Sequence, residues 1–238
     1  MKENTIKTVA EFVTENIKTA DVFKKHGIDF CCGGGITVKD ACDKNNVDFN
    51  TLINELNLLE GKASFLNDYD KWELDFLIDF IQNTHHKYVE ENLTLLKQYG
   101  DKVAKVHGNN HIELLEIKQL IRAVSDELTT HMKKEELILF PFIKKLVNAK
   151  REGIKLETPS FGSVNNPIQM MEEDHDLAGD IFKRLSELTN TYQTPEDACN
   201  TFKALYAKLK EFEDDLHLHV HLENNILFPK AKQIEERL

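Results

Sequence analysis

Apolar residues recur at helical spacing along most of the chain, first in short segments and then in long ones. In the first sixty residues this spacing predicts four short helices, over residues 8–13, 17–25, 38–44 and 49–59. Gly27 and Asp48 have the residue types expected after a helix end and before a helix start. Three consecutive glycines oppose regular structure, so we predict a turn at Cys31–Gly35.

From residue 70 onward the same period predicts four long helices, over residues 71–99, 111–150, 166–188 and 194–236. Asp70, Asn166 and Thr194 stand where N-caps are expected, the last two followed by proline. Pro141 and Pro229 fall inside helical pattern and should kink or end their helices. Long helices joined by loops of ten to twenty residues favour an antiparallel four-helix bundle.

The pattern therefore predicts an all-α protein in three parts. Residues 1–60 form a small helical domain that contains the CCGG motif, residues 61–70 form a polar linker, and residues 71–238 form the bundle. The composition agrees, because ten glycines and five prolines are few for 238 residues and good helix formers are plentiful.

Charge and hydropathy exclude several classes of protein. A net charge of −11 argues against nucleic acid as a partner, because phosphates would be repelled. No apolar run approaches the roughly 20 residues that span a bilayer. The N-terminus lacks the apolar core of a secretory signal, so we expect a cytoplasmic protein without membrane contact. The number and spacing of the four cysteines do not suggest a disulfide framework.

Two segments of the bundle repeat each other and share a His and a Glu. HMKKEELILFP (131–141) and HVHLENNILFP (219–229) match at six of eleven positions, and a further histidine lies 45 or 44 residues before each. A His and a Glu four residues apart project from one face of a helix. We therefore predict a dinuclear metal site whose ligands come from all four long helices: His86, His131, Glu135, His175, His219 and Glu223.

The alternative is that these histidines only pack or hydrogen-bond. A single histidine on a bundle face is usually a surface or satisfied core residue, but the repeated spacing makes that reading weak for this set. Spacing alone does not separate His86 from its neighbour His85. Imidazole with carboxylate suits iron, manganese or zinc. We interpret His85, His107, His111, His217 and His221 as surface residues or as neighbours of the ligands, and Cys42 and Cys199 as core.

The repeated motif resembles hemerythrin-like domains, and the motif IDFCCGG (28–34) resembles the small N-terminal domain of the iron–sulfur cluster repair di-iron proteins. The resemblance covers about residues 1–60 and 71–238. Carried over by matching motifs, it implies that the six residues above bind iron, with His86 preferred to His85. The cofactor is then two iron ions with an oxo or hydroxo bridge. The third glycine, Gly35, departs from the family motif.

This resemblance implies repair of iron–sulfur clusters damaged by nitrosative or oxidative stress, by iron donation and with reactivity toward nitric oxide. Partners would be damaged iron–sulfur proteins or cluster scaffolds and the gases NO and O2, and a homodimer is left open. Two alternatives remain: an O2- or NO-binding sensor or carrier, and an NO or peroxide reductase. Whether the protein is an enzyme is not fixed by the sequence.

Cys31 and Cys32 suggest a second chemical site. An adjacent pair is too strained for an ordinary disulfide but could bind a metal ion, take up nitrosyl groups or exchange with a partner thiol. The backbone N–H groups of the three glycines could lower the pKa of a thiolate. The alternative is a structural turn with partly buried thiols, which leaves the role of the pair open.

Overall fold

A computed structural model describes residues 7–59 and 68–238, and within these ranges it contains helices and no named strand. The first unit consists of α1 (Val9–Glu15), α2 (Thr19–Lys25), α3 (Val38–Asn45) and α4 (Phe49–Asn57). Thr8 and Glu11 form a capping box at α1, and Asp48 caps α4 as predicted. Gly27, directly after the α2 cap, has φ 67°, which favours glycine.

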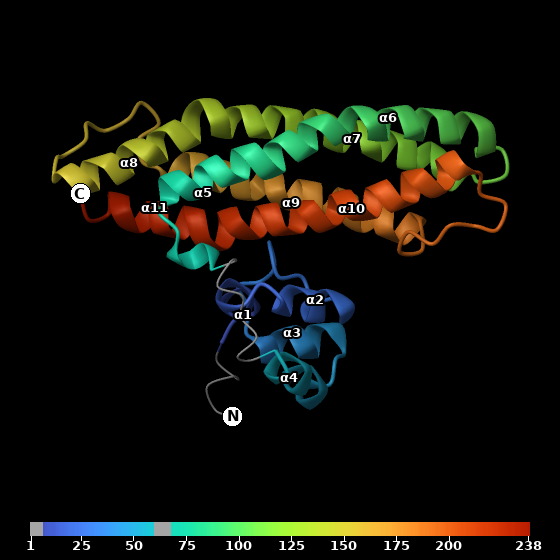
Figure 1. Cartoon of the computed structure of the whole chain (residues 1–238), viewed down its shortest axis with the longest axis horizontal. Coiled ribbons are helices and arrows are strands. Elements are labelled where there is room, and N and C mark those ends of the chain that lie inside the picture. The colour runs from blue at the N-terminus through green and yellow to red at the C-terminus, as the bar shows by residue number, and fades with distance from the viewer. Residues whose placement is uncertain (1–6, 60–67) are drawn as a thin grey trace.

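The second unit is the predicted antiparallel bundle, drawn lengthwise in Figure 1. Its first long helix is built from α5 (Leu74–Ile81) and α6 (Lys87–His107), and its second from α7 (Glu113–Lys134) and α8 (Phe140–Glu152). The third is α9 (Asn165–Leu188), and the fourth is built from α10 (Asn200–Leu222) and α11 (Phe228–Glu235). The all-α fold class is confirmed.

Several helix ends differ from the prediction. Asp70 lies in a short 3-10 turn and Glu73 is the N-cap of α5. The fourth long helix begins at Asn200, because Pro195 to Ala198 form a separate turn closed by the bond from Ala198 N to Pro195 O. Cap-like residue types therefore marked the approach to these helices, not their first turns.

Pro141 and Pro229 neither end their helices nor break them. Each lies in the first turn after a π-helical segment, Glu135–Leu139 or Glu223–Leu227, and the helix continues beyond it. A π turn has hydrogen bonds between residues i and i+5. It therefore shifts the helical hydrogen-bond pattern just before the proline, which has no N–H to donate. A third π segment, Gln82–His86, joins α5 to α6. The repeated Ile-Leu-Phe-Pro sequence thus accompanies a π turn in both halves of the bundle.

The apolar core falls into two clusters that meet at these π turns. One contains Val89, Leu93 and Leu128 together with the core of the first unit, and the other contains Leu77, Ile81 and other residues at the opposite end of the bundle. Buried polar side chains occupy the layer between them. Burial of apolar side chains on both sides holds the four helices in register at that layer.

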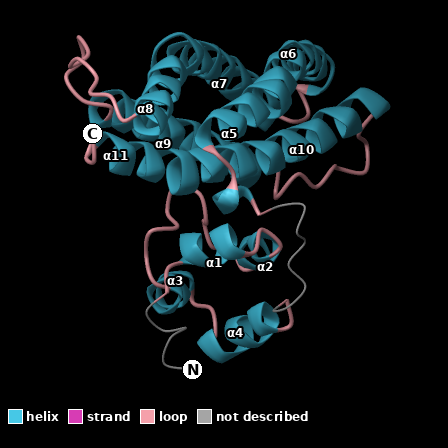
Figure 2. Ribbon diagram, turned by 60° about the vertical axis from the view of Figure 1, so that its left-hand side comes forward, coloured by secondary structure: helices cyan, strands magenta, loops and turns pink. Residues whose placement is uncertain are grey.

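The first unit packs on the bundle beside α10, as Figures 1 and 2 show. Phe30 lies edge-on to the rings of His217 and His221, and Asn225 Nδ2 donates to the Phe30 and Cys31 carbonyls at 3.4 and 3.2 Å. The predicted linker falls mostly outside the described residues, so the division at residues 60 and 70 stays a prediction. Among the described helices, none is long and apolar enough to cross a membrane.

Candidate metal centre

The structure brings together all six side chains that the sequence predicts as metal ligands, each at most 3% exposed. Two of the three π segments begin at a glutamate of the set, and the third ends at His86. π turns are frequent at functional sites, since the extra residue in the turn re-aims side chains. The six come from all four long helices: His86, His131, Glu135, His175, His219 and Glu223.

The six residues form two overlapping groups that could each hold a metal ion. Donor atoms lie within 4.8 Å of one another in His86, Glu135, His219 and Glu223, and likewise in His131, Glu135, His175 and Glu223. Glu135 and Glu223 belong to both groups. Because each carboxylate has two oxygens, the shared glutamates can bridge two neighbouring ions.

The donor atoms in this layer fit a cation better than they fit one another. His86 Nε2, both Glu135 oxygens and Glu223 Oε2 are buried without a hydrogen bond. Ion-pair contacts remain, such as His86 Nε2 to Glu135 Oε2 at 3.3 Å. His131 Nε2 and His175 Nε2 lie 3.0 Å apart. Unsatisfied buried polar atoms are costly, so this set is poorly stabilised unless an ion occupies it.

Three of the histidines are held from behind by a polar side chain. His86 Nδ1 contacts Glu136 at 2.7 Å, His131 Nδ1 contacts Asp174 at 3.3 Å, and His175 Nδ1 contacts Asn224 at 2.8 Å. Such contacts fix the tautomer and orientation of metal-binding imidazoles. Sequence reasoning missed all three partners. Each directly neighbours a predicted ligand in the chain, and that adjacency was the available signal.

The buried carboxylates shift the proton affinity of the histidines. Burial lowers the pKa of His86, but Glu135 and Glu223 outweigh it and raise the value to about 10. His131 behaves alike, with burial opposed by Glu135 and Asp174 and a pKa of about 10. The His131 contact in turn lowers the pKa of Asp174 to about 2. Protons thus neutralise this layer without a metal, and a bound dication would replace them.

Two histidines that we interpreted as surface residues or neighbours of the ligands are buried beside the cluster. His85 is 2% exposed, stacks on His219 with ring centroids 5.4 Å apart, and bonds Asp215 at 2.9 Å. His221 is 1% exposed and contacts Asn225 at 3.0 Å. Neither belongs to the two groups of potential ligands, which agrees with the choice of His86 over His85.

Comparison with known proteins identifies the family to which this chain belongs. Residues 77–231 match the family model described as the hemerythrin HHE cation binding domain. The chain belongs to the family of iron–sulfur cluster repair proteins with a hemerythrin-like domain. Residues 5–60 match a second family model, described as a domain of unknown function (DUF542). The resemblance inferred from the two motifs is therefore confirmed.

Proteins named for iron-sulfur cluster repair align with this chain over most of their own length. The iron-sulfur cluster repair protein ScdA of Staphylococcus haemolyticus is 38% identical, covering 93% of this chain and 96% of its own length. ScdA of Staphylococcus epidermidis is 37% identical, covering 94% and 96%. The iron-sulfur cluster repair protein YtfE of Yersinia pseudotuberculosis is 36% identical, covering 90% and 91%.

The CCGG turn contacts the bundle through Asn225 and differs from the expected thiolate nest. The Asp29 carboxylate accepts from Cys31 N at 2.9 Å, from Cys31 Sγ at 3.1 Å and from Gly33 N at 2.9 Å. The Gly33 N–H is thus engaged by Asp29 and does not stabilise a thiolate. The Cys32 contact, burial and Asp29 hold the pKa of the Cys31 thiol well above its ordinary value. The chemical role of Cys31 and Cys32 stays a prediction.

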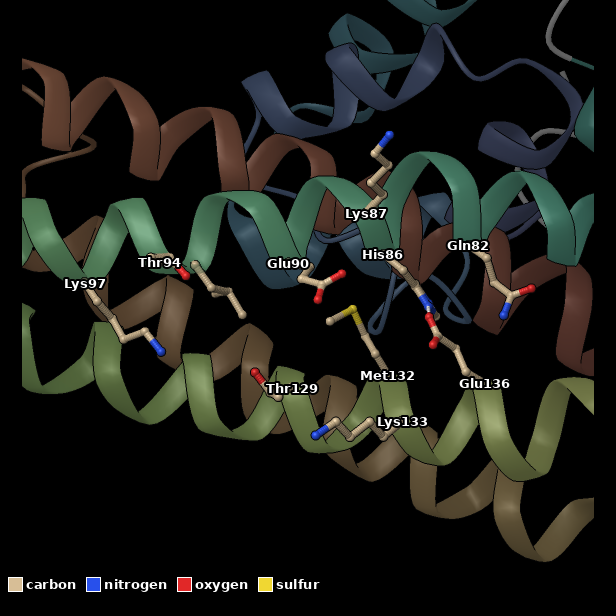
Figure 3. Close-up of a pocket in the computed structure, with 11 residues that line it drawn as sticks. Gln82, His86, Lys87, Glu90, Thr94, Lys97, Thr129, Met132, Lys133 and Glu136 are labelled. Atoms are coloured by element: carbon tan, nitrogen blue, oxygen red, sulfur yellow. Dashed lines mark hydrogen bonds and ion pairs between the residues drawn. The ribbon is translucent and has the colours of Figure 1, made fainter.

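A pocket of about 290 Å³ between α6 and α7 reaches the cluster from outside. Figure 3 shows His86, at the end of the π segment before α6, pointing toward Glu136 at one end of this pocket. Thr94, Thr129 and Met132 line the remainder with other side chains of the two helices. Of the six residues only His86 lines this pocket, and its Nδ1 contacts the exposed Glu136, so the pocket ends at the outer side of the candidate centre.

Proposed function

We propose that this chain repairs damaged iron–sulfur clusters by means of a pair of iron ions held at the six-residue layer. The observation that carries the proposal is the sharing of Glu135 and Glu223 between two groups of potential ligands. Family membership supplies the biological context, because the similar proteins are named for cluster repair.

The ligand set favours ions that are reactive and exchangeable. Four imidazoles and two bridging carboxylates offer about eight bonds, whereas two six-coordinate irons need about twelve. By analogy with zinc, open coordination positions distinguish reactive sites from closed structural ones. Bound iron would supply redox chemistry and a source of transferable iron.

The chain's own residues hold and insulate this centre. Leu139 and Phe140 lie in the repeated motif and are 1% exposed, so water reaches the layer poorly from that side. Glu136, Asp174 and Asn224 orient the histidines from the outer side. These residues set which faces of the ligands remain available, and the pocket brings small molecules to the outer side of His86.

Reactivation of a cluster enzyme damaged by nitric oxide tests the proposal. Iron-loaded wild-type protein should restore the activity of the damaged enzyme, and Glu135→Ala plus Glu223→Ala should lose the iron of the buried layer together with this restoration. Glu127→Ala is a matched control, since this exposed glutamate lies on the same long helix outside the cluster. Full restoration by the double variant would contradict the proposal.

The α6–α7 pocket also favours a second function, in which O2 or NO is bound or NO or peroxide is reduced. Its end at His86 gives a small molecule access to the same layer. Rapid mixing with NO would separate reversible binding from turnover to N2O. Turnover with an electron donor but without cluster repair would favour a reductase over a repair protein.

Cys31 and Cys32 belong to the same proposal as groups that assist transfer to a cytoplasmic iron–sulfur protein or cluster scaffold. The contacts of Asn225 with the backbone of this turn support it, because Asn225 lies two residues from Glu223. Replacement of both cysteines by alanine should lower repair while leaving the iron content unchanged. Unaltered repair would remove the pair from the proposal.

A further inference from the structure

A second group of metal-binding side chains lies at the far end of the bundle. His107 and His111 belong to the end of α6 and the turn after it, and Asp197 and Cys199 belong to the connection that leads into α10. Figure 1 shows these two connections at the same end of the molecule. His107 is 21 residues beyond His86, which corresponds to about 30 Å of helix.

The four side chains form two short contacts between the connections. His107 Nε2 lies 3.2 Å from Cys199 Sγ, and His111 Nε2 lies 3.0 Å from Asp197 Oδ1. The two imidazole rings have centroids 6.5 Å apart, and both pack on Phe202, at 5.3 and 5.5 Å. A shared apolar support therefore keeps the two pairs side by side.

Cys199 differs from the expectation that it belongs to the core. It is exposed and forms the N-cap position of α10, whereas Cys31 and Cys42 are buried. The Cys199 thiol contacts an imidazole from the other connection, and because it is exposed it does not fill the apolar core. The same thiol with two histidines and a carboxylate is a donor set that suits zinc or another borderline divalent ion.

We propose that His107, His111, Asp197 and Cys199 bind one divalent transition-metal ion, such as zinc(II) or iron(II), in a tetrahedral site. Bond lengths of about 2.0–2.3 Å place neighbouring tetrahedral donors roughly 3.3–3.7 Å apart, close to the spacing within each pair. The ion takes the place of the proton in each contact.

Closing the two pairs around one ion requires their side chains to turn, because these four residues are not among the described groups whose donor atoms all lie within 4.8 Å of one another. The Asp197 side chain is 57% exposed, and the Cys199 thiol is exposed, so both can turn without displacing packed atoms. The binding site is independent of the buried six-residue layer, and its occupation links the α6–α7 turn to the connection before α10.

Cobalt(II) titration of the full chain tests this site. Coordination by a thiolate produces a sulfur-to-cobalt charge-transfer band in the near ultraviolet, which His and Glu ligands alone do not give. We expect the band in wild-type protein and in Glu135→Ala plus Glu223→Ala, so the result is separate from the fate of the buried centre. Cys199→Ser should abolish the band, and Cys31→Ser plus Cys32→Ser should retain it.

The histidines are tested by His107→Gln and His111→Gln, each of which should weaken cobalt binding at least tenfold, with helical content checked by circular dichroism. Absence of the band in wild-type protein would overturn the proposal. So would a band that follows Cys31 and Cys32, or one that keeps its affinity in both glutamine variants, which would indicate a thiolate acting without the histidines.

Discussion

At the scale of single residues, the CCGG turn depends on one glycine far more than on the next. A Cβ added at Gly34 would lie 2.4 Å from the Phe30 carbonyl oxygen, whereas one added at Gly35 meets nothing within 4 Å. The middle glycine is therefore required by close backbone packing. The extra glycine that departs from the family motif is not.

Gly34→Ala should consequently destabilise the protein by about 1–3 kcal/mol, the usual cost of overpacking. Gly35→Ala should change stability by less than about 0.5 kcal/mol. Urea denaturation of the two full-length variants measures both values. Equal effects of the two substitutions would show that the turn does not pack as described.

The protonation of Cys31 gives a second residue-scale prediction. Because Cys32, burial and Asp29 raise the pKa of its thiol, Cys31 should remain a thiol at neutral pH and react slowly. Peptide mapping after brief iodoacetamide treatment should find Cys199 alkylated well before Cys31, since Cys199 is exposed. Preferential labelling of Cys31 would contradict this environment.

At the scale of elements, docking of the CCGG turn on the bundle depends on Asn225, a position at which the two copies of the repeat differ. Asn225 bonds the Phe30 and Cys31 carbonyls, and Leu137 occupies the matching position in the other half. Asymmetry between the two halves of the repeat thus specifies where the first unit binds.

Asn225→Leu should loosen this contact without altering metal content. Each lost hydrogen bond contributes about 0.5–1.5 kcal/mol. Hydrogen exchange should accelerate in the peptide covering residues 28–35, and Asn148→Leu, at an exposed α8 position, should leave it unchanged. Unchanged exchange in Asn225→Leu would show that other contacts suffice to hold the turn.

Local patterns in the sequence predicted the helices and the six-residue layer but missed the features that depend on how helices meet. The period of apolar residues predicted the helices and the repeat predicted the layer of six side chains, because both depend on local spacing. The π turns were missed, since Pro141 and Pro229 predict an interruption but not the register change that avoids it. The burial of His85 and the exposure of Cys199 depend on which helices meet, which no local pattern contains.

At the scale of the whole molecule, the candidate centre divides the core. Two apolar clusters are separated by a layer of buried imidazoles and carboxylates, and several polar atoms of this layer lack hydrogen bonds. Without a metal this layer weakens the bundle at its middle. With a metal it joins all four long helices, so ion binding and global stability should be linked.

Removal of the metal by a chelator should therefore lower the melting temperature by roughly 5–15 °C, as expected for an ion present at 100 to 1,000 times its Kd. Differential scanning calorimetry of loaded and stripped protein measures the shift. Glu135→Ala plus Glu223→Ala, combined with Cys199→Ser to remove the second proposed site, should melt at one temperature with or without chelator. A chelator-dependent shift in that variant would place the stabilising ion elsewhere.

A crystal structure of iron-loaded protein with anomalous data at the iron edge tests most directly whether the six side chains hold two iron ions. We expect two iron peaks within the layer, both contacted by Glu135 and Glu223, with His86 and His219 at one ion and His131 and His175 at the other. A single ion in the layer, zinc in place of iron at that layer, or a layer without iron would contradict this arrangement.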